Sequence, residues 1–150
     1  MKYYFFLWDI YSNWRPSPIL IDWILFKCVE QYFMYMKAIT AQDQKTADLI
    51  LKETDPSIQK SLWRSLDIDI DLWDSMKYAV MYEWVYEKFK QNDRFRKILL
   101  SEDCDLFVEA SPVDRIWWIW YYSVDAMKNI DSRWENLLWK ITTEVRDLLK

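Results

Sequence analysis

The sequence predicts an α+β fold: a predominantly helical single domain over residues 1–150 with a small N-terminal β-hairpin or sheet. Three observations support this prediction. Two stretches near the N-terminus are rich in aromatic and β-branched residues, as strands are. From Cys28 onward, apolar residues recur mainly at helical spacing. A length of 150 residues also lies in the commonest range for one compact domain.

The predicted strands are residues 3–7 and residues 19–26. Within the second stretch, Asp22 and Trp23 fall where a two-residue hairpin turn is expected. Such a turn prefers the pair Asp-Gly, because both of its central residues take positive φ. The stretch is therefore interpreted as a hairpin with an unfavourable residue at its second turn position.

Helices account for most of the remaining chain. Residues 28–39 are apolar nearly all round, which is typical of a helix buried on most sides. Asp55 followed by Pro56 is a helix cap with proline at the first helical position, and predicts a helix through about Leu66. The other predicted elements are helices over residues 71–90, 93–100 and from about 133, and a short strand over residues 106–110.

Composition argues against several classes of function. The chain has no histidine and two cysteines, so we expect neither a metal site nor a disulfide framework. A net charge of -4 argues against a surface that binds bulk nucleic acid. No apolar run approaches the roughly 20 residues of a membrane span, and residues 1–10 lack the layout of a secretory signal. We therefore expect a cytoplasmic protein that is not bound to a membrane.

Glu30 and Lys37 are the only charges in the apolar helix over residues 28–39. Seven residues apart, about two turns, they project from one helix face together with Phe33 and Met34. Charges in an apolar environment are costly unless they are paired, so the two are expected to meet partners or to line a pocket. The alternative is that both extend to solvent at the helix ends.

A second charged group lies in residues 109–117. It places Glu109, Asp114 and Arg115 among apolar residues. An arginine suits phosphate or carboxylate, and a carboxylate can hold a ribose hydroxyl or transfer a proton. An Asp-Arg pair that fastens a loop is the alternative. The aromatic residues 117–122 are interpreted either as core or as a platform on which a base stacks.

With these residues described, the sequence resembles the NADAR (YbiA-like) superfamily, whose domains are linked to NAD and ADP-ribose metabolism. The resemblance covers nearly the whole chain. It implies the α+β fold of that superfamily. The strongest segments are residues 11–14 with 16–18, residues 28–32 running to 37–38, residues 108–117, and residues 135–138 leading to 145–146.

The resemblance implies hydrolysis of an N-glycosidic bond to ribose, in an early riboflavin-pathway intermediate or in ADP-ribosylated guanine, without a metal or cofactor. Glu30 would be the acid/base carboxylate, and Lys37 a nucleophile that forms a Schiff base with the opened ribose. Non-catalytic binding of ADP-ribose or NAD, or a structural role with a protein partner, remains the alternative. The resemblance makes Asp114 a further catalytic residue, and Asn13, Trp14, Tyr32, Arg115, Trp117 and Asn136 substrate-binding residues.

The chain departs from the family pattern in one systematic way. It has no glycine and eleven tryptophans, where average usage would give about ten glycines. We hypothesise that the natural chain has glycine where the family does, through a reassigned codon or a substitution. Tryptophan at such positions should cost stability through strain or overpacking. The positions are Trp8, Trp23, Trp63, Trp84, Trp118, Trp120, Trp139 and Trp134.

Overall fold

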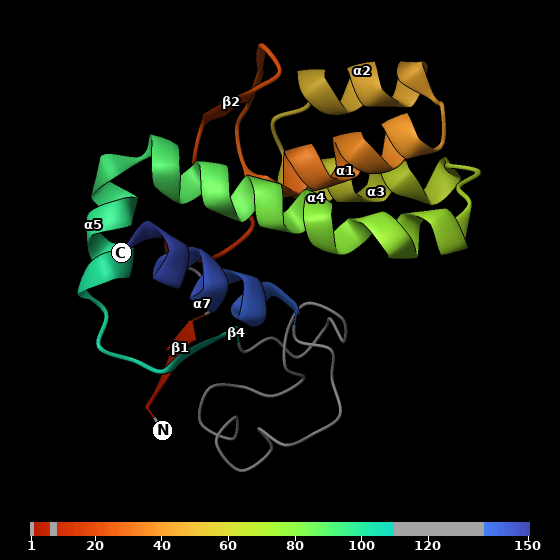
Figure 1. The fold of residues 1–150 in the computed structure, drawn as a ribbon. Helices are drawn as coiled ribbons and strands as arrows, with labels where there is room; N and C mark the ends of the chain where they lie inside the picture. The colour runs from red at the N-terminus through yellow and green to blue at the C-terminus, as the bar shows by residue number, and fades with distance from the viewer. Residues whose placement is uncertain (1, 7–8, 110–136) are drawn as a thin grey trace. The chain divides into compact units, whose positions relative to one another are not determined.

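The computed structural model describes residues 2–6, 9–109 and 137–150. The chain divides into two compact units, and each is described by itself. Residues 13–91 form one unit; residues 1–12 and 92–150 form the other. Figure 1 shows the elements of both units in chain order by colour.

The unit of residues 13–91 begins with the predicted hairpin. Strands β2 (Ile19–Ile21) and β3 (Ile24–Phe26) pair in antiparallel register. Between them, Asp22 has φ 47° and Trp23 has φ 67°, the pair of positive angles typical of a type I′ turn. Trp23 is 92% exposed, so the largest side chain occupies a glycine-favouring conformation without packing against the core. The predicted hairpin and its turn are confirmed.

The backbone of β2 is met by a side chain from α4 (Ile70–Gln91). The Gln91 carboxamide accepts a hydrogen bond from the Leu20 N–H at 2.9 Å and donates one to the Leu20 carbonyl at 2.9 Å. Both backbone groups of Leu20 are therefore satisfied, although its side chain is exposed.

Helix α1 (Val29–Thr40) packs against α2 (Gln44–Lys52), α3 (Pro56–Leu62) and α4 (Figure 1). Aspartates begin two of these helices: the Asp43 carboxylate accepts from Thr46 N at 2.9 Å, and the Asp55 carboxylate accepts from Ser57 N at 2.8 Å. The predicted cap at Asp55 is thus confirmed. The helix that follows it tightens into a 3₁₀-helix at Trp63–Ser65, close to the predicted end.

Gln31 fixes the start of α1. Its side chain is fully buried; the carbonyl oxygen accepts from Lys27 N at 2.8 Å, and the amide donates to the carbonyls of Ile50, Leu51 and Glu53. Because buried polar groups are costly unless bonded, this amide holds α1 in register with the end of α2.

The second unit is built around a parallel pair of strands that are far apart in the sequence. Strand β1 (Tyr3–Phe6) runs parallel to β4 (Leu106–Glu109), and α7 (Leu137–Leu149) packs on β4. Helix α5 (Asp93–Ser101) contacts α7. The predicted strand and helices near these positions are confirmed, and the fold is α+β and mainly helical. None of the helices in the described parts is long and apolar enough to cross a membrane.

Two further tryptophans at positions where we expect glycine carry a cost. Trp84 is fully buried against Phe26 and Tyr32, and its indole N–H meets no acceptor among the described residues. The buried indole N–H of Trp139 likewise finds none there. An unsatisfied buried donor costs about 1–3 kcal/mol. Together with Trp23, these positions support the expectation that the tryptophans lower stability.

Candidate functional site

The start of α1 holds a buried carboxylate. Glu30 is 6% exposed, and its Oε2 accepts a hydrogen bond from the Trp14 indole Nε1 at 3.2 Å. The Glu30 backbone N–H donates to the Asn13 carbonyl at 3.2 Å, so the segment before the hairpin is fastened to the first turn of the helix. The burial of Glu30 excludes the alternative in which this carboxylate extends to solvent.

Asn13, whose backbone carbonyl accepts the hydrogen bond from the Glu30 N–H, also has a buried side-chain acceptor. Its side chain is 4% exposed, yet its Oδ1 accepts no hydrogen bond from the residues that the structure describes. Such an oxygen is costly to bury without a donor. A hydroxyl of a bound ligand is a donor that would satisfy it.

Lys37 lies among aromatic rings farther along α1. Its Nζ is 4.2 Å from the ring centroid of Trp63 and 5.4 Å from those of Phe33 and Trp73. The rings of Phe33 and Trp73 meet edge to face with centroids 4.9 Å apart. Lys37 is half-buried, so its ammonium extends along aromatic faces that favour a cation.

Glu30 and Lys37 share one face of α1, as their spacing predicts. Seven residues of helix separate their backbones by about 10 Å. A long lysine side chain leaning toward the helix N-terminus shortens the gap. The arrangement therefore offers a proton-transfer group and an amine on the same helix surface.

Tyr32 lies elsewhere. Two residues after Glu30, it is turned about 200° around the helix axis, toward the opposite face of α1. Its hydroxyl donates a hydrogen bond to the Glu83 carboxylate of α4. Burial, followed by the bond to Glu83 and its charge, raises the pKa of Tyr32 well above its ordinary value. The structure therefore does not bring Tyr32 together with Glu30 and Lys37.

Cys28, immediately before α1, is not equipped to act as a nucleophile. Its buried thiol lies 3.7 Å from the Gln59 side-chain oxygen. Burial raises the pKa of this thiol. A thiol that stays protonated is a poor nucleophile, which leaves Lys37 as the nucleophilic candidate on this helix.

Four of the predicted site residues lie outside the described residues, as do four of the eight tryptophans at positions where we expect glycine. In the parts of the chain that are described, no group of three or more histidine, cysteine or acidic side chains is placed to hold a metal ion. The residues outside are Asp114, Arg115, Trp117 and Asn136, with Trp8, Trp118, Trp120 and Trp134.

Sequence reasoning missed the direct contacts of the two charged residues. The hydrogen bond from Trp14 to Glu30 joins residues 16 apart, and no local pattern encodes it. The ring of Trp73 beside Lys37 had one signal: Trp73 is not among the eight tryptophans at positions where we expect glycine. Trp63, the nearest ring, is one of those eight and gave no such signal.

Comparisons with known proteins agree with the fold and identify the family of the chain. Residues 3–150 match the family model described as NADAR domain. The chain is 39% identical over 129 residues to protein irg-1 of Caenorhabditis elegans, covering 83% of this chain and 61% of that protein. It is 31% identical over 146 residues to N-glycosidase R617 of Acanthamoeba polyphaga mimivirus, covering 92% and 86%.

The NMR structure of the Escherichia coli protein YbiA has a TM-score of 0.78 to this one, with 23% identity, over 99% of this chain and 84% of that one. At this identity the likeness shows the fold, and it confirms the α+β prediction. The chain spans less than two thirds of irg-1, the first of these relatives. The match over nearly all of its length nevertheless confirms the predicted resemblance: the chain belongs to the NADAR domain family.

Proposed function

We propose that this protein is an N-glycosidase that cleaves the bond between ribose and base in a nucleotide-like substrate. The observation that carries the proposal is the buried Glu30 carboxylate, which the Trp14 indole holds on the helix face that also bears Lys37. Buried ionisable groups with a specific partner are typical of functional sites. The name of the mimivirus relative, N-glycosidase R617, supports the same chemistry.

The reaction assigns a separate role to each charged group. The Lys37 amine attacks the anomeric carbon of ribose, and the carbon–nitrogen bond to the base breaks. The bonding pair leaves with the base, which takes a proton from the protonated Glu30 carboxyl. Opening of the sugar ring gives a Schiff base on Lys37, which water hydrolyses to the free amine and the ribose aldehyde.

Glu30 has a second role at the point of bond cleavage. The transition state of glycoside cleavage carries positive charge at the anomeric carbon, and the Glu30 carboxylate that forms as its proton passes to the base stabilises that charge. The Trp14 N–H orients this carboxylate without neutralising it, because an indole donates a hydrogen bond but carries no charge.

The remaining roles concern substrate binding. The buried Asn13 oxygen is suited to accept from a ribose hydroxyl, with Trp14 beside it. Tyr32 keeps its predicted role only through the resemblance, and the pair of charged groups does not require it. The roles of Asp114 in catalysis and of Arg115, Trp117 and Asn136 in binding phosphate, ribose or base rest on the resemblance as well.

Two substrate classes contain the required bond: phosphorylated ribose intermediates of riboflavin synthesis, and guanine that carries ADP-ribose. Both present a ribose linked through nitrogen to a base. The proposal needs neither a cofactor nor a metal, because proton transfer and an amine nucleophile supply the chemistry.

The test traps the Schiff base. The purified chain is incubated with each substrate class and with borohydride, and the adduct is located by peptide mass spectrometry. We expect a ribosyl adduct on Lys37 that disappears in Lys37→Ala and persists in Lys45→Ala, an exposed lysine of α2. An adduct found equally on exposed lysines, or base release that survives Lys37→Ala, would refute the lysine mechanism.

The role of Glu30 is tested separately with Glu30→Gln. The amide still accepts from Trp14 but cannot deliver a proton, so base release should fall by about 10²–10⁴-fold. Trapping of a preformed ribose aldehyde on Lys37 should persist, because it needs no departing base. Unchanged base release would remove Glu30 from the mechanism, and saturable binding with no turnover in any variant would indicate a binding module.

A further inference from the structure

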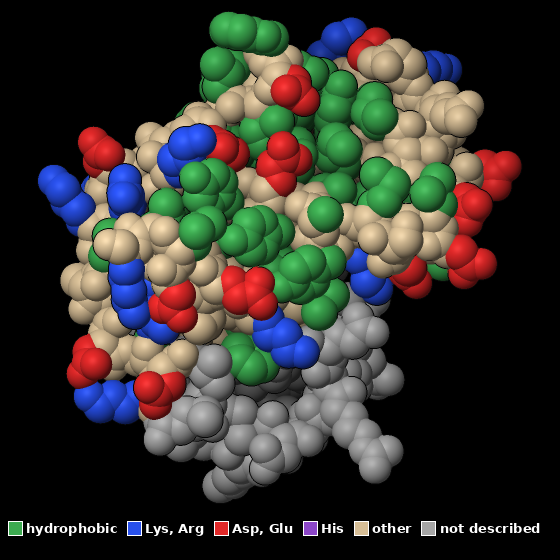
Figure 2. Space-filling model, in the orientation of Figure 1, with side chains coloured by type: hydrophobic (Ala, Val, Ile, Leu, Met, Phe, Trp, Pro, Cys, Tyr) green, Lys and Arg blue, Asp and Glu red, His purple; other side chains and the backbone are tan. Residues whose placement is uncertain are grey.

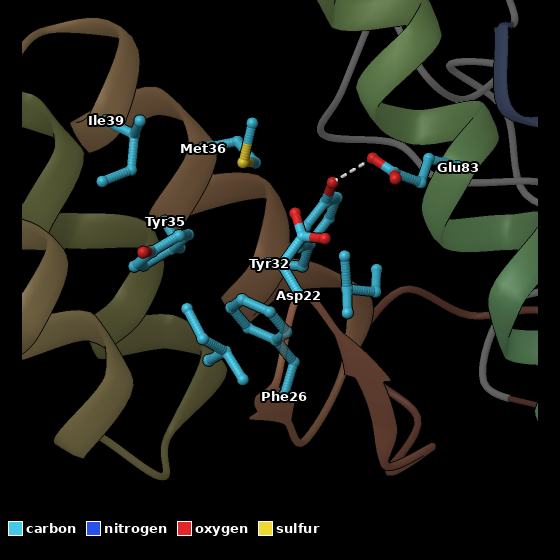
Figure 3. A pocket seen from close by; sticks show the side chains of 9 residues that line it. Asp22, Phe26, Tyr32, Tyr35, Met36, Ile39 and Glu83 are labelled. Atoms are coloured by element: carbon cyan, nitrogen blue, oxygen red, sulfur yellow. Dashed lines mark hydrogen bonds between the residues drawn. The ribbon is translucent and has the colours of Figure 1, made fainter.

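A hollow of about 260 Å³ lies on the side of α1 opposite to Glu30 and Lys37. Its residues on α1 include Tyr32, Tyr35 and Met36, which are turned about 140–240° from Glu30 around the helix axis. The hollow is formed within the unit of residues 13–91 by α1, α4 and the hairpin (Figure 3). It is therefore separate from the site of the proposed glycosidase reaction.

The floor and the rim of the hollow differ in chemistry. The half-buried side chains of Tyr35 and Met36 give the floor an aromatic and apolar surface, and the almost fully buried Phe26 and Tyr32 lie behind it. The ring centroid of Phe26 lies 5.0 Å from that of Tyr32 and 5.3 Å from that of Tyr35, and both pairs of rings meet edge to face. These contacts hold the rings in place without a bound ligand.

The rim carries negative charge. Asp22 at the hairpin turn and Glu83 on α4 both line the hollow and are exposed to solvent, and no lysine or arginine among the described residues lines it (Figure 3). Burial is the main cause of the raised pKa of Tyr32, and both carboxylates raise that pKa further. The Tyr32 hydroxyl already donates a hydrogen bond to Glu83. Acidic side chains also stand among hydrophobic ones over the face in Figure 2.

From this juxtaposition we propose that the hollow binds a small amphiphilic organic cation, an arylalkyl-ammonium, with its ring on Tyr35 and Met36 and its ammonium at Asp22 and Glu83. Aromatic faces attract cations, and the exposed carboxylates match the opposite charge. The volume lies just below the range of about 300–1,000 Å³ for drug-sized ligands, so the occupant is smaller than those.

The test compares three ligands of similar shape by methyl and amide NMR of the full chain at pH 7. The ligands are 2-phenylethylammonium, 2-phenylethanol and phenylacetate, which carry positive, zero and negative charge. We expect saturable shifts at Met36 with the cation, at a dissociation constant of about 1 mM, with the alcohol weaker and phenylacetate weakest. Equal binding of the three, or no shift with the cation, overturns the proposal.

Variants separate the rim from the net charge of the chain. Glu83→Gln keeps an acceptor for Tyr32 and should weaken the cation about fivefold, from roughly 1 kcal/mol for a charge pair at 4 Å in water. Asp74→Asn removes a charge of α4 that pairs with Lys77 and should leave the affinity for the cation unchanged. Ile39→Lys, at the exposed edge of the hollow, supplies a tethered ammonium and should abolish binding. The site is refuted if Glu83→Gln and Asp74→Asn change the affinity for the cation equally, or if Ile39→Lys binds the cation as tightly as the parent chain.

Discussion

Replacing Trp23 with glycine should stabilise the protein. Trp23 has φ 67° at the second position of the β2–β3 turn. A left-handed backbone costs a residue with a Cβ about 1–2 kcal/mol, and glycine avoids this cost. Glycine also gives the unfolded chain more conformational freedom, which offsets about 0.4–1 kcal/mol of that gain in stability. Since Trp23 is 92% exposed, little packing is lost. The net gain in the free energy of unfolding is about 0.5–1 kcal/mol.

The matched control is Trp23→Ala, which removes the indole but keeps the Cβ and therefore the strain. Thermal melts by calorimetry should place Trp23→Gly about 1–4 °C above the parent, since about 1 kcal/mol shifts the midpoint by about 2–4 °C in a chain of this length. Trp23→Ala should stay near the parent, and urea midpoints should give the same order. If Trp23→Gly melts no higher than Trp23→Ala, backbone strain at this turn is not what limits stability.

Three further predictions concern α1 and its neighbours. Trp63→Gly removes the ring nearest to Lys37 and should speed borohydride trapping about fivefold, because a cation–π contact of about 1 kcal/mol holds the ammonium; Trp63→Phe should change the rate less. Gln31→Ala leaves buried backbone groups unbonded and should lower the free energy of unfolding by about 2–3 kcal/mol in urea titrations. The hydrogen bonds from Thr46 lower the pKa of Asp43 below its ordinary 3.8, so the stability that Asp43 contributes is present above pH 3.8 and is lost as the pH falls further. Asp43→Asn should therefore reduce the loss of the melting temperature at acid pH. Asp43→Ala, which also removes the helix cap, should in addition lower the melting temperature at pH 7.

Local signals in the sequence predicted most of the elements. A stretch rich in aromatic and β-branched residues with Asp22 and Trp23 in its middle indicated the hairpin, and the pair Asp55 and Pro56 indicated the start of α3. Each of these signals lies within a few residues of the structure it produces. The parallel pairing of β1 with β4 joins segments about a hundred residues apart, and nothing in either segment names its partner.

The candidate site divides in the same way. Helical spacing placed Glu30 and Lys37 on one face, because a helix fixes the direction of every side chain along it. Their surroundings come from other elements: Trp14 precedes the hairpin and Trp63 follows α3. The family resemblance placed Tyr32 in the predicted site, but its position on the helix turns its hydroxyl toward Glu83 instead.

The Gln91 carboxamide affects how the hairpin meets other chains. Strand edges with open N–H and carbonyl groups are where proteins join into extended sheets, and exposed apolar side chains favour that joining. The hairpin has such side chains in Leu20 and Leu25. At Leu20, however, one amide takes up both backbone groups, as a neighbouring strand would. The hairpin thus keeps exposed apolar side chains, while Leu20, the middle residue of β2, offers no backbone hydrogen bond to a strand of another chain.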